Sequence, residues 1–237
     1  MDQLVRNMKP KMIVLTGAGI SAESGIATFR DSDGLWEQYR IEEVATPEAW
    51  RRNPELVQRF YNERRKQVLA CEPNDAHRFF AQCENLFDVS IITQNIDDLH
   101  RRAGSSNVLH LHGEIRKSKS SGPKQEQAYY DIDGWELTMD DKCPDGYLLR
   151  PHVVWFGEMV PNLEKAVLLV AEADILVVVG TSLNVYPAAN LVHYAPDHCR
   201  RFVIDPKTEE LEVPRSFTKI NATAVNGVKE MEKYLSI

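Results

Sequence analysis

Short runs of apolar residues recur along the chain, and segments with a helical spacing of apolar residues lie between them. The apolar runs cover residues 12–15, 89–93, 108–111, 175–179 and 202–204. The helical patterns cover residues 54–69, 75–84, 163–173 and 228–235. A strand without a polar face must be covered on both sides, and the crossover helices of a parallel sheet supply that cover. The alternation predicts an α/β fold with a doubly wound, Rossmann-like parallel sheet.

Two longer stretches interrupt this alternation. Residues 33–73 are mostly helical and charged, and residues 114–151 are polar, with Gly, Pro and Ser in clusters. Both stretches are too long to be tight connections. We expect them to meet as a smaller module beside a main domain of residues 1–32, 74–113 and 152–237, with ligand sites in the crevice between the two.

The composition restricts the class of protein. With 237 residues, 43% of them hydrophobic and 27% charged, the chain can bury a full core and is unlike disordered or membrane proteins. The 35 acidic residues exceed the 28 basic ones, which argues against nucleic acid as the main partner. No run approaches the roughly 18 apolar residues of a membrane span. The four cysteines lie far apart, as in a reducing compartment, so we expect a cytoplasmic protein.

A glycine turn follows the first apolar run. Gly17, Gly19 and Ala22 have the G-x-G-x-x-A spacing, in which small residues let the backbone approach a pyrophosphate. A tight turn without a ligand can have the same spacing. The acidic residue expected about twenty residues further on is missing, because the chain enters residues 33–73 instead. A standard dehydrogenase is therefore disfavoured.

Five segments in order along the chain carry a more specific pattern. They are residues 17–30 (GAGISAESGIATFR), 93–100 (TQNIDDLH), 110–113 (HLHG), 153–158 (VVWFGE) and 180–188 (GTSLNVYPA). Together they resemble the motifs of the sirtuins, the NAD-dependent protein lysine deacylases, over nearly the whole chain. The resemblance implies NAD as a consumed co-substrate, acylated protein lysines as partners, and a monomer.

The resemblance also implies an NAD site. Phe29 and Arg30 would lie on a loop over the nicotinamide ribose, and Asp97 would bind the nicotinamide amide. The pattern alone leaves Phe29 open as a core aromatic residue, and Asn95 or Asp97 as a helix N-cap. The implied NAD-binding residues are Gly17, Ala18, Gly19, Ser21, Phe29, Arg30, Gln94, Asn95, Ile96, Asp97, Gly180, Thr181, Ser182, Asp205 and Ala224. Asp205 stands where many sirtuins have asparagine, and its carboxylate can accept hydrogen bonds from ribose hydroxyls.

His112 and Asn95 are the implied catalytic residues. In the family the acyl-lysine oxygen displaces nicotinamide, and a histidine then takes the proton of a ribose hydroxyl. The products are nicotinamide, free lysine and 2′-O-acyl-ADP-ribose. A lone histidine after an apolar strand is more often a structural hydrogen-bonding residue, so only the motif favours the catalytic role.

Residues 153–158 resemble the segment that binds an extended substrate peptide by strand addition. The implied contacts are Val154, Phe156, Gly157 and Glu158, with Val154 and Phe156 beside the lysine tunnel. An ordinary apolar strand end fits the same composition.

Tyr61 and Arg64 are three residues apart in a helical pattern and therefore share a face. Their spacing resembles the motif of class III sirtuins, in which the two side chains bind the carboxylate of succinyl- or malonyl-lysine. Ala45 matches the small residue that leaves room for such an acyl group. The alternative is a solvated helix surface, the usual place for an arginine in a charged run such as residues 63–66.

One departure from the family concerns zinc. Most sirtuins bind zinc through two Cys-x-x-Cys pairs, where this chain has residues 118–121 (SKSS) and 143–146 (CPDG). Serine and glycine cannot supply thiolates, so we predict that residues 114–151 form a degenerate zinc module without structural zinc. A small core of Tyr129, Tyr130, Trp135 and Leu137 would order it instead.

The predicted function is NAD-dependent removal of succinyl and malonyl groups from protein lysines, with some deacetylase activity. Two alternatives stay open: ADP-ribosyl transfer to a protein side chain, and an NAD- or ADP-ribose-binding module without turnover. His112 and Asn95 argue against the binding module, because a pure binder needs neither.

Overall fold

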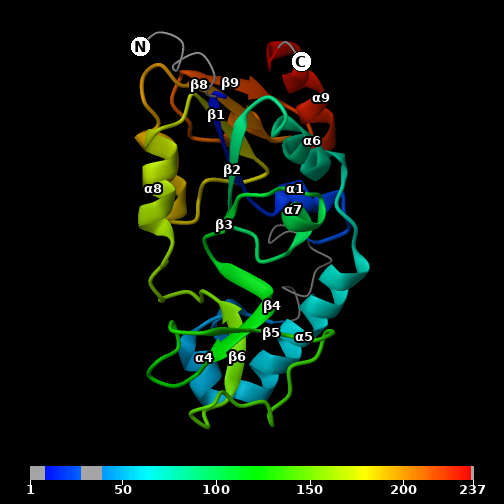
Figure 1. Ribbon diagram of the computed structural model, residues 1–237, viewed down its shortest axis with the longest axis vertical. Helices are drawn as coiled ribbons and strands as arrows, with labels where there is room; N and C mark the ends of the chain where they lie inside the picture. The colour runs from blue at the N-terminus through cyan, green and yellow to red at the C-terminus, as the bar shows by residue number, and fades with distance from the viewer. Residues whose placement is uncertain (1–8, 28–38, 236–237) are drawn as a thin grey trace.

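A computed structural model describes residues 9–27 and 39–235, which form two sheets of different type (Figure 1). The strands of the larger sheet are β1 (Lys11–Thr16), β2 (Asp88–Thr93), β3 (Val108–His110), β7 (Ile175–Val179), β8 (Arg200–Ile204) and β9 (Phe217–Ile220). They lie in the order β3-β2-β1-β7-β8-β9, and all pairs are parallel. This is the strand order of a doubly wound sheet, so the predicted fold class is confirmed.

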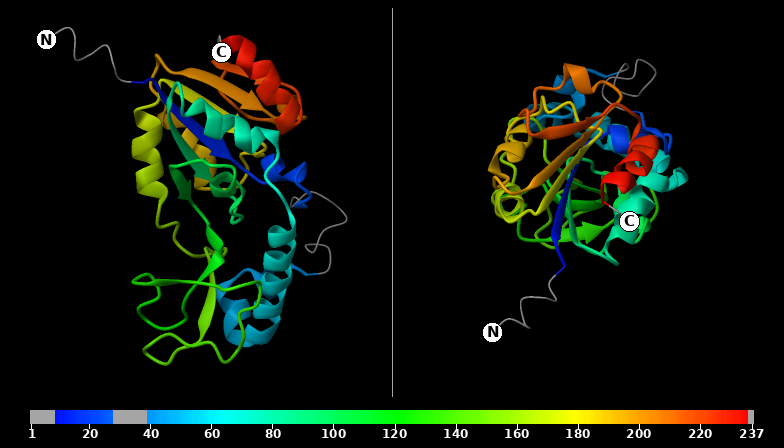
Figure 2. Two further views of the ribbon diagram at one scale, coloured as in Figure 1. Left: turned by 45° about the vertical axis from the view of Figure 1, so that its right-hand side comes forward. Right: turned by 90° about the horizontal axis from the view of Figure 1, so that it is seen from above.

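Helices cover both faces of this sheet (Figure 2). One face carries α1 (Gly19–Ala22), α6 (Asp75–Cys83) and α9 (Ala224–Leu235), and the other carries α8 (Leu163–Ala171) and the 3-10 helix η2 (Ala188–Tyr194). Successive residues of β1 point to opposite faces, so Met12 packs in the first layer and Ile13 in the second. Within the described residues, no helix combines the length and the apolar character that a membrane crossing needs.

The observed elements differ from the predicted ones mainly at the far edge of the sheet. β9 has no counterpart among the predicted apolar runs, because only its two end residues, Phe217 and Ile220, are buried. α9 begins at Ala224, four residues before the predicted helix.

The smaller sheet is antiparallel and has the order β5-β4-β6. Its strands are β4 (Gly113–Ser120), β5 (Tyr129–Asp131) and β6 (Leu149–Val153), and the helices beside it are α3 (Ile41–Val44), α4 (Pro47–Arg52) and α5 (Pro54–Ala70). Thr46 and Asn53 cap α4 and α5, because their side chains accept hydrogen bonds from the backbone N–H groups of Ala49 and Leu56. We call these helices and this sheet the small module.

An apolar cluster joins the helices of the small module to its sheet. Val57, Phe60 and Tyr61 of α5 pack with Ile115 of β4 and Val153 of β6. Residues 41–70 and 113–153, which are far apart in the sequence, therefore share one core.

Arg65 connects α5 by hydrogen bonds to the polar residues 114–151 of the small module. Its side chain is fully buried and donates to the carbonyl of Ile115 at 2.6 Å, to Asn62 Oδ1 at 2.7 Å and to the carbonyl of Trp135 at 2.8 Å. Asn62 also exchanges two hydrogen bonds with the backbone of Leu137. Burial lowers the pKa of Arg65 to about 10, so the guanidinium stays charged at neutral pH.

The expected aromatic core of this stretch is only partly present. Leu137 is buried, but Tyr129 and Trp135 are exposed, and the Tyr129 ring stacks on His152 at the surface. The buried Arg65 side chain instead supplies donors to backbone carbonyls at Ile115 and Trp135. Cys143 Sγ lies 3.4 Å from Ser120 Oγ, and the described residues contain no cluster of three or more His, Cys, Asp or Glu side chains that could hold a metal ion.

Candidate active site

The candidate site lies at the carboxyl edge of the larger sheet. β1 and β7 are neighbours, but the chain continues from β1 into α1 on one face and from β7 toward η2 on the other. Such a point, where the connections diverge, leaves a crevice in which doubly wound sheets bind ligands. This edge faces the small module (Figure 1).

Two glycine loops meet at this point. Gly17 N–H donates to the carbonyl of Val179 at 3.0 Å, and Gly19 N–H donates to the carbonyl of Gly180 at 2.8 Å. A Cβ atom on Gly19 would lie 2.6 Å from the Gly180 Cα, so the loops can only be this close without side chains. The glycines are needed for the contact between the loops.

This contact corrects part of the sequence interpretation. The glycine spacing predicts that the backbone at Gly17 and Gly19 approaches a pyrophosphate, but both amides donate to carbonyl groups of the protein. The amide of Gly180 likewise donates to the carbonyl of Ile204. These amides already have acceptors, because the turns continue the hydrogen bonding of the sheet. Ala18 occupies the N-cap position of α1, between the two glycines.

Polar side chains from three strand ends form one connected group at the crevice. Ser21 Oγ donates to Asp97 Oδ2 at 3.0 Å. The Asn95 amide donates to the carbonyl of Gly17 at 3.1 Å and to Ser21 Oγ at 3.2 Å. The Gln94 amide donates to Thr181 Oγ1 at 3.0 Å. The structure thus brings together predicted site residues that lie up to 164 positions apart, from Gly17 to Thr181.

The amide side chains in this group suit a ligand with hydroxyl groups. Gln94 and Asn95 both use their NH₂ groups on the protein, and within the described residues no donor binds their side-chain oxygens. A ribose presents two hydroxyl donors, which such oxygens can accept. The donor set therefore fits a nucleotide sugar.

Asp97 is a buried carboxylate in the centre of the group. It accepts from Ser21 Oγ and, at 3.1 Å, from the backbone of Leu99, the first residue of α7 (Leu99–Arg102). The N-cap position of α7 is Asp98, so Asp97 lies one residue before the cap and the alternative of Asp97 as the N-cap is wrong. Burial raises the pKa of Asp97, while these hydrogen bonds and Arg64 oppose that rise.

His112 is arranged as a proton acceptor. Its Nδ1 lies 3.0 Å from the carbonyl oxygen of Gln94, and a carbonyl can only accept, so Nδ1 carries the proton. In the neutral ring the lone pair is then on Nε2. Burial lowers the pKa of His112, and the Gln94 carbonyl opposes this shift. The ring is therefore neutral at physiological pH and able to take a proton.

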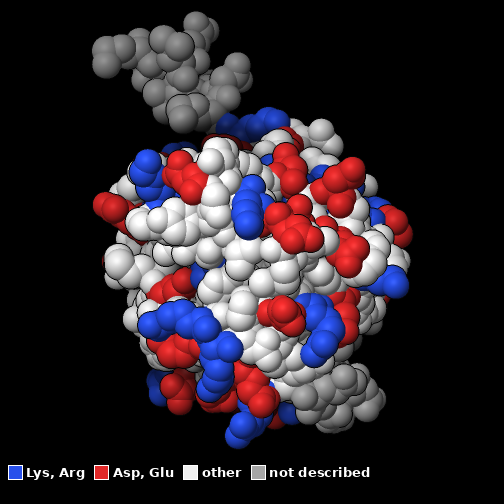
Figure 3. Space-filling model, turned by 90° about the horizontal axis from the view of Figure 1, so that it is seen from below, with Lys and Arg blue, Asp and Glu red and all other residues white. Residues whose placement is uncertain are grey.

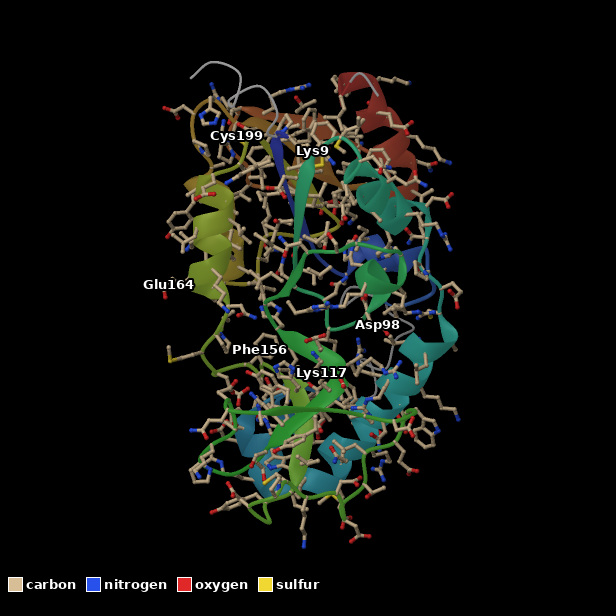
Figure 4. All side chains as sticks on the ribbon, in the orientation of Figure 1. Lys9, Asp98, Lys117, Phe156, Glu164 and Cys199 are labelled. Carbon is tan, nitrogen blue, oxygen red and sulfur yellow. The ribbon has the colours of Figure 1, made fainter. Side chains whose placement is uncertain are left out.

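The segment expected to bind a peptide connects His112 to the small module. Val154 N–H donates to the carbonyl of His112 at 2.9 Å, and Phe156 N–H donates to the carbonyl of Ala45 at 3.0 Å. Phe156 is exposed and lies where the larger sheet and the small module meet (Figure 4). The Glu158 carboxylate accepts from Trp155 N–H at 2.8 Å and from Arg150, so this side chain is engaged within the protein.

Arg64 is buried, with 9% of its surface exposed. Burial lowers its pKa, whereas Tyr61 and Asp97 both raise it electrostatically. Arg64 is therefore within electrostatic range of both Tyr61 and the crevice carboxylate Asp97. The alternative of a solvated helix surface is wrong for this residue.

On the outer face of the small module, basic and acidic side chains are mixed, and neither sign of charge dominates (Figure 3).

Other predicted residues lie around this centre. Asp205 follows β8, is buried, and accepts from the backbone of Lys207 at 2.9 Å. Ala224 begins α9, which is tied to α1 because Val225 N–H donates to Glu23 at 2.9 Å. The carbonyl of Ile96 accepts from Ile115 N–H at 2.7 Å, Ser182 is partly exposed, and Gly157 is exposed. The predicted residues Phe29 and Arg30 lie outside the described residues.

The sequence of the whole chain decides the family. The sequence profile of the Sir2 family matches residues 17–187, which is most of the chain. The chain belongs to the Sir2 family. A relative of this Sir2 chain from Bacteroides thetaiotaomicron, named NAD-dependent protein deacylase, is 51% identical over 227 residues, covering 94% of this chain and 97% of the relative.

Solved structures of the family are similar to this Sir2 chain along its whole length. A Sir2 homologue in complex with NAD has a TM-score of 0.82 and 38% sequence identity, covering 100% of this chain and 94% of its own. A complex described as Sir2, p53 peptide and NAD⁺ has a TM-score of 0.77 and 30% identity, covering 100% of this chain and 98% of its own.

Sequence reasoning missed three residues around the site of this Sir2 chain. Trp155 contacts Tyr61, Arg150 contacts Glu158 and Trp155, and Arg65 holds the small module. Trp155 could have been found, because it lies inside the VVWFGE segment and a buried indole N–H needs an acceptor. Arg65 and Arg150 are buried because segments distant in the sequence pack around them. The sequence shows only that these residues are charged, which by itself does not predict burial.

Proposed function

We propose that this Sir2 chain is an NAD-dependent protein lysine deacylase that prefers acidic acyl groups, succinyl and malonyl, over acetyl. The observation that carries the proposal is Arg64, a buried cation beside Tyr61 and the crevice. A guanidinium binds a carboxylate through two parallel hydrogen bonds. Burial strengthens such a pair, because little water competes for it.

Tyr61 complements Arg64 on the same face of α5. Burial raises the pKa of Tyr61 to about 12, so the phenol remains neutral and can donate to a carboxylate. Ala45 is buried in the same apolar cluster as Tyr61, and a larger side chain at this position would compete with an acyl group for space. These three residues would form the acyl pocket.

NAD would bind along the crevice. The glycine loops, Ser21, Thr181 and Ser182 would lie along the phosphates, and Asp205 and Ala224 beside the adenosine half. Gln94 and Asn95 would accept from the nicotinamide ribose through their side-chain oxygens, and Asp97 would hold the nicotinamide amide. When bound, NAD supplies an activated glycosidic bond and a ribose hydroxyl as acyl acceptor.

His112 would be the general base. Its Nε2 lone pair can take the proton of the ribose hydroxyl after nicotinamide has left, while Gln94 keeps Nδ1 protonated. Asn95 follows β2, which β1 separates from β7, and its amide is hydrogen-bonded to Gly17 and Ser21. This side chain would orient the ribose toward that base. The products would be nicotinamide, free lysine and 2′-O-acyl-ADP-ribose.

The substrate peptide would pair with residues 154–158 as an extended strand. The N–H groups of Val154, Phe156 and Glu158 donate within the protein, so the peptide would use the carbonyls of Val154 and Phe156 and the N–H of Gly157. The sequence predictions of a cytoplasmic monomer without structural zinc, without nucleic acid or membrane partners, belong to the same proposal.

The experiment is incubation of the protein with NAD and succinyl-, malonyl- or acetyl-lysine peptides, followed by mass spectrometry, with His112→Tyr as the control. The proposal requires deacylated peptide and 2′-O-acyl-ADP-ribose from the wild type and neither from the variant. Mass added to protein instead would indicate ADP-ribosyl transfer. Absence of any product would indicate a binding module.

A further inference from the structure

Trp155 makes a specific contact with the acyl pocket. Its indole Nε1–H donates to Tyr61 Oη at 3.0 Å, and the two side chains are each 2% exposed. An indole N–H can donate only, so Tyr61 must be the acceptor in this bond. Within the described residues, no oxygen or nitrogen accepts the hydroxyl hydrogen of Tyr61 in return.

The bond fixes the direction in which Tyr61 can donate. A phenol has one hydrogen and rotates about its C–O bond, so it can present either the hydrogen or a lone pair to a ligand. With Trp155 on the lone-pair side, the hydrogen must point elsewhere. A ligand in the acyl pocket then meets a donor, which favours a carboxylate over an uncharged methyl group.

We propose that Trp155 is a specificity-determining positioning residue, which orients the Tyr61 hydroxyl as a donor to acidic acyl groups. This inference rests on the proposed function, because it concerns the acyl pocket assigned there. Trp155 acts through Tyr61 and does not itself need to touch the acyl carboxylate.

The surroundings of Trp155 keep its ring in one position. The Arg150 guanidinium lies over the ring at 3.7 Å from its centroid, and Glu158 binds Arg150 at 2.9 Å. The same Glu158 carboxylate accepts from the backbone N–H of Trp155 at 2.8 Å. The Trp50 ring also packs against Trp155, with 5.9 Å between the two ring centroids. Backbone and ring are therefore both held, and the N–H has little freedom to turn away from Tyr61.

The test compares kcat/KM for succinyl- and acetyl-lysine peptides of one sequence in the wild type and in Trp155→Phe. The variant keeps an aromatic ring and loses the N–H. We expect the succinyl-to-acetyl ratio to fall about five-fold, the effect of one hydrogen bond, through a higher KM for the succinyl peptide. The kcat/KM for acetyl peptide and the KM for NAD should stay within about two-fold, which a general structural defect would not allow.

Three further variants isolate the effect of the Trp155 N–H. Trp50→Phe makes the same change at a neighbouring ring and should leave the ratio unchanged. If Trp155→Phe does not fold, benzothienylalanine at position 155, which has sulfur in place of the indole nitrogen, removes the donor and keeps the shape. In a Tyr61→Phe background the loss of the Trp155 N–H should have no further effect on the ratio, because the hydroxyl on which it acts is gone.

Three outcomes would overturn the proposal. An unchanged ratio without the N–H would show that Trp155 does not position Tyr61. A fall of equal size in the Tyr61→Phe background would show that it acts by another route. A wild type that does not prefer the succinyl peptide would overturn the proposed function and this inference together, whereas the first two results leave the proposed function standing.

Discussion

Ser21 Oγ donates a 3.0 Å hydrogen bond to Asp97 Oδ2 between two buried side chains that follow different strands. It joins helix α1, which follows β1, to the loop after β2, and Asn95 donates to the same Ser21 oxygen. One small hydroxyl thus organises the polar group in which the nicotinamide ribose would bind.

Removing this hydroxyl should weaken the NAD site. Ser21→Ala leaves the buried Asp97 side chain with one hydrogen bond fewer and less firmly held, which should weaken NAD binding by about ten-fold. We expect kcat/KM for NAD to fall by that factor, measured at saturating acyl peptide. Ser106→Ala, an exposed position, is the matched control and should have wild-type kinetics.

Arg64→Met should reduce selectivity rather than all activity. The guanidinium would lose its bond to the acyl carboxylate, so kcat/KM for succinyl- and malonyl-lysine peptides should fall about a hundred-fold. The acetyl-lysine peptide has no carboxylate and should lose much less. Arg59→Met, the same change at an exposed position of α5, should alter neither rate. An equal loss for acetyl and succinyl peptides would contradict the assigned role of Arg64.

The pH dependence of turnover should follow His112. A general base must be neutral, and burial lowers the pKa of this histidine below its usual 6.5. Activity should therefore be retained down to pH 6.5 and fall only below it, as His112 takes up a proton. The acetyl-lysine peptide is the substrate to use, because its acyl group does not titrate.

A second rate separates His112 from other titrating groups. Exchange of labelled nicotinamide into NAD reports the step before the ribose proton is removed, so it should lack the acid limb seen in deacylation. A deacylation midpoint above pH 6.5, or the same limb in both rates, would argue against His112 as the base.

The small module should be stable without zinc, and its stability should depend on the hydrogen bonds of Arg65. Arg65→Met would leave the Ile115 and Trp135 carbonyls without this donor and Asn62 Oδ1 with Leu137 N–H alone, which should lower the free energy of unfolding by about 3 kcal/mol. Arg59→Met should leave the unfolding free energy within about 0.5 kcal/mol of wild type. Elemental analysis should find no bound zinc, and a chelator should not lower the melting temperature. One tightly bound zinc per chain would refute this part of the account.

The larger sheet and most of the crevice could be predicted from the sequence, because both depend on local patterns. Apolar strands such as 175–179 indicate a covered parallel sheet, and its carboxyl edge is set by the chain direction. Gln94 and Asp97 could be placed at that edge for the same reason. β9 was missed because a sheet-edge strand buries too few residues to give an apolar run.

The remaining features depend on contacts between distant segments. The amides of Gly17 and Gly19 were assigned to a phosphate because the spacing does not indicate that β7 would lie beside them. Arg64 and Arg65 are neighbours in a charged run, yet both are buried, because the small module closes over that face of α5. The bond from Trp155 to Tyr61 spans 94 positions and follows only from the packed structure.

Selection of acidic acyl groups is measured by the ratio of kcat/KM for succinyl- over acetyl-lysine peptides of one sequence, with wild-type protein at saturating NAD. The buried Arg64 and the Tyr61 donor predict a ratio of about ten or more in favour of the succinyl peptide. A ratio of one or below would contradict the claim that this Sir2 chain selects acidic acyl groups.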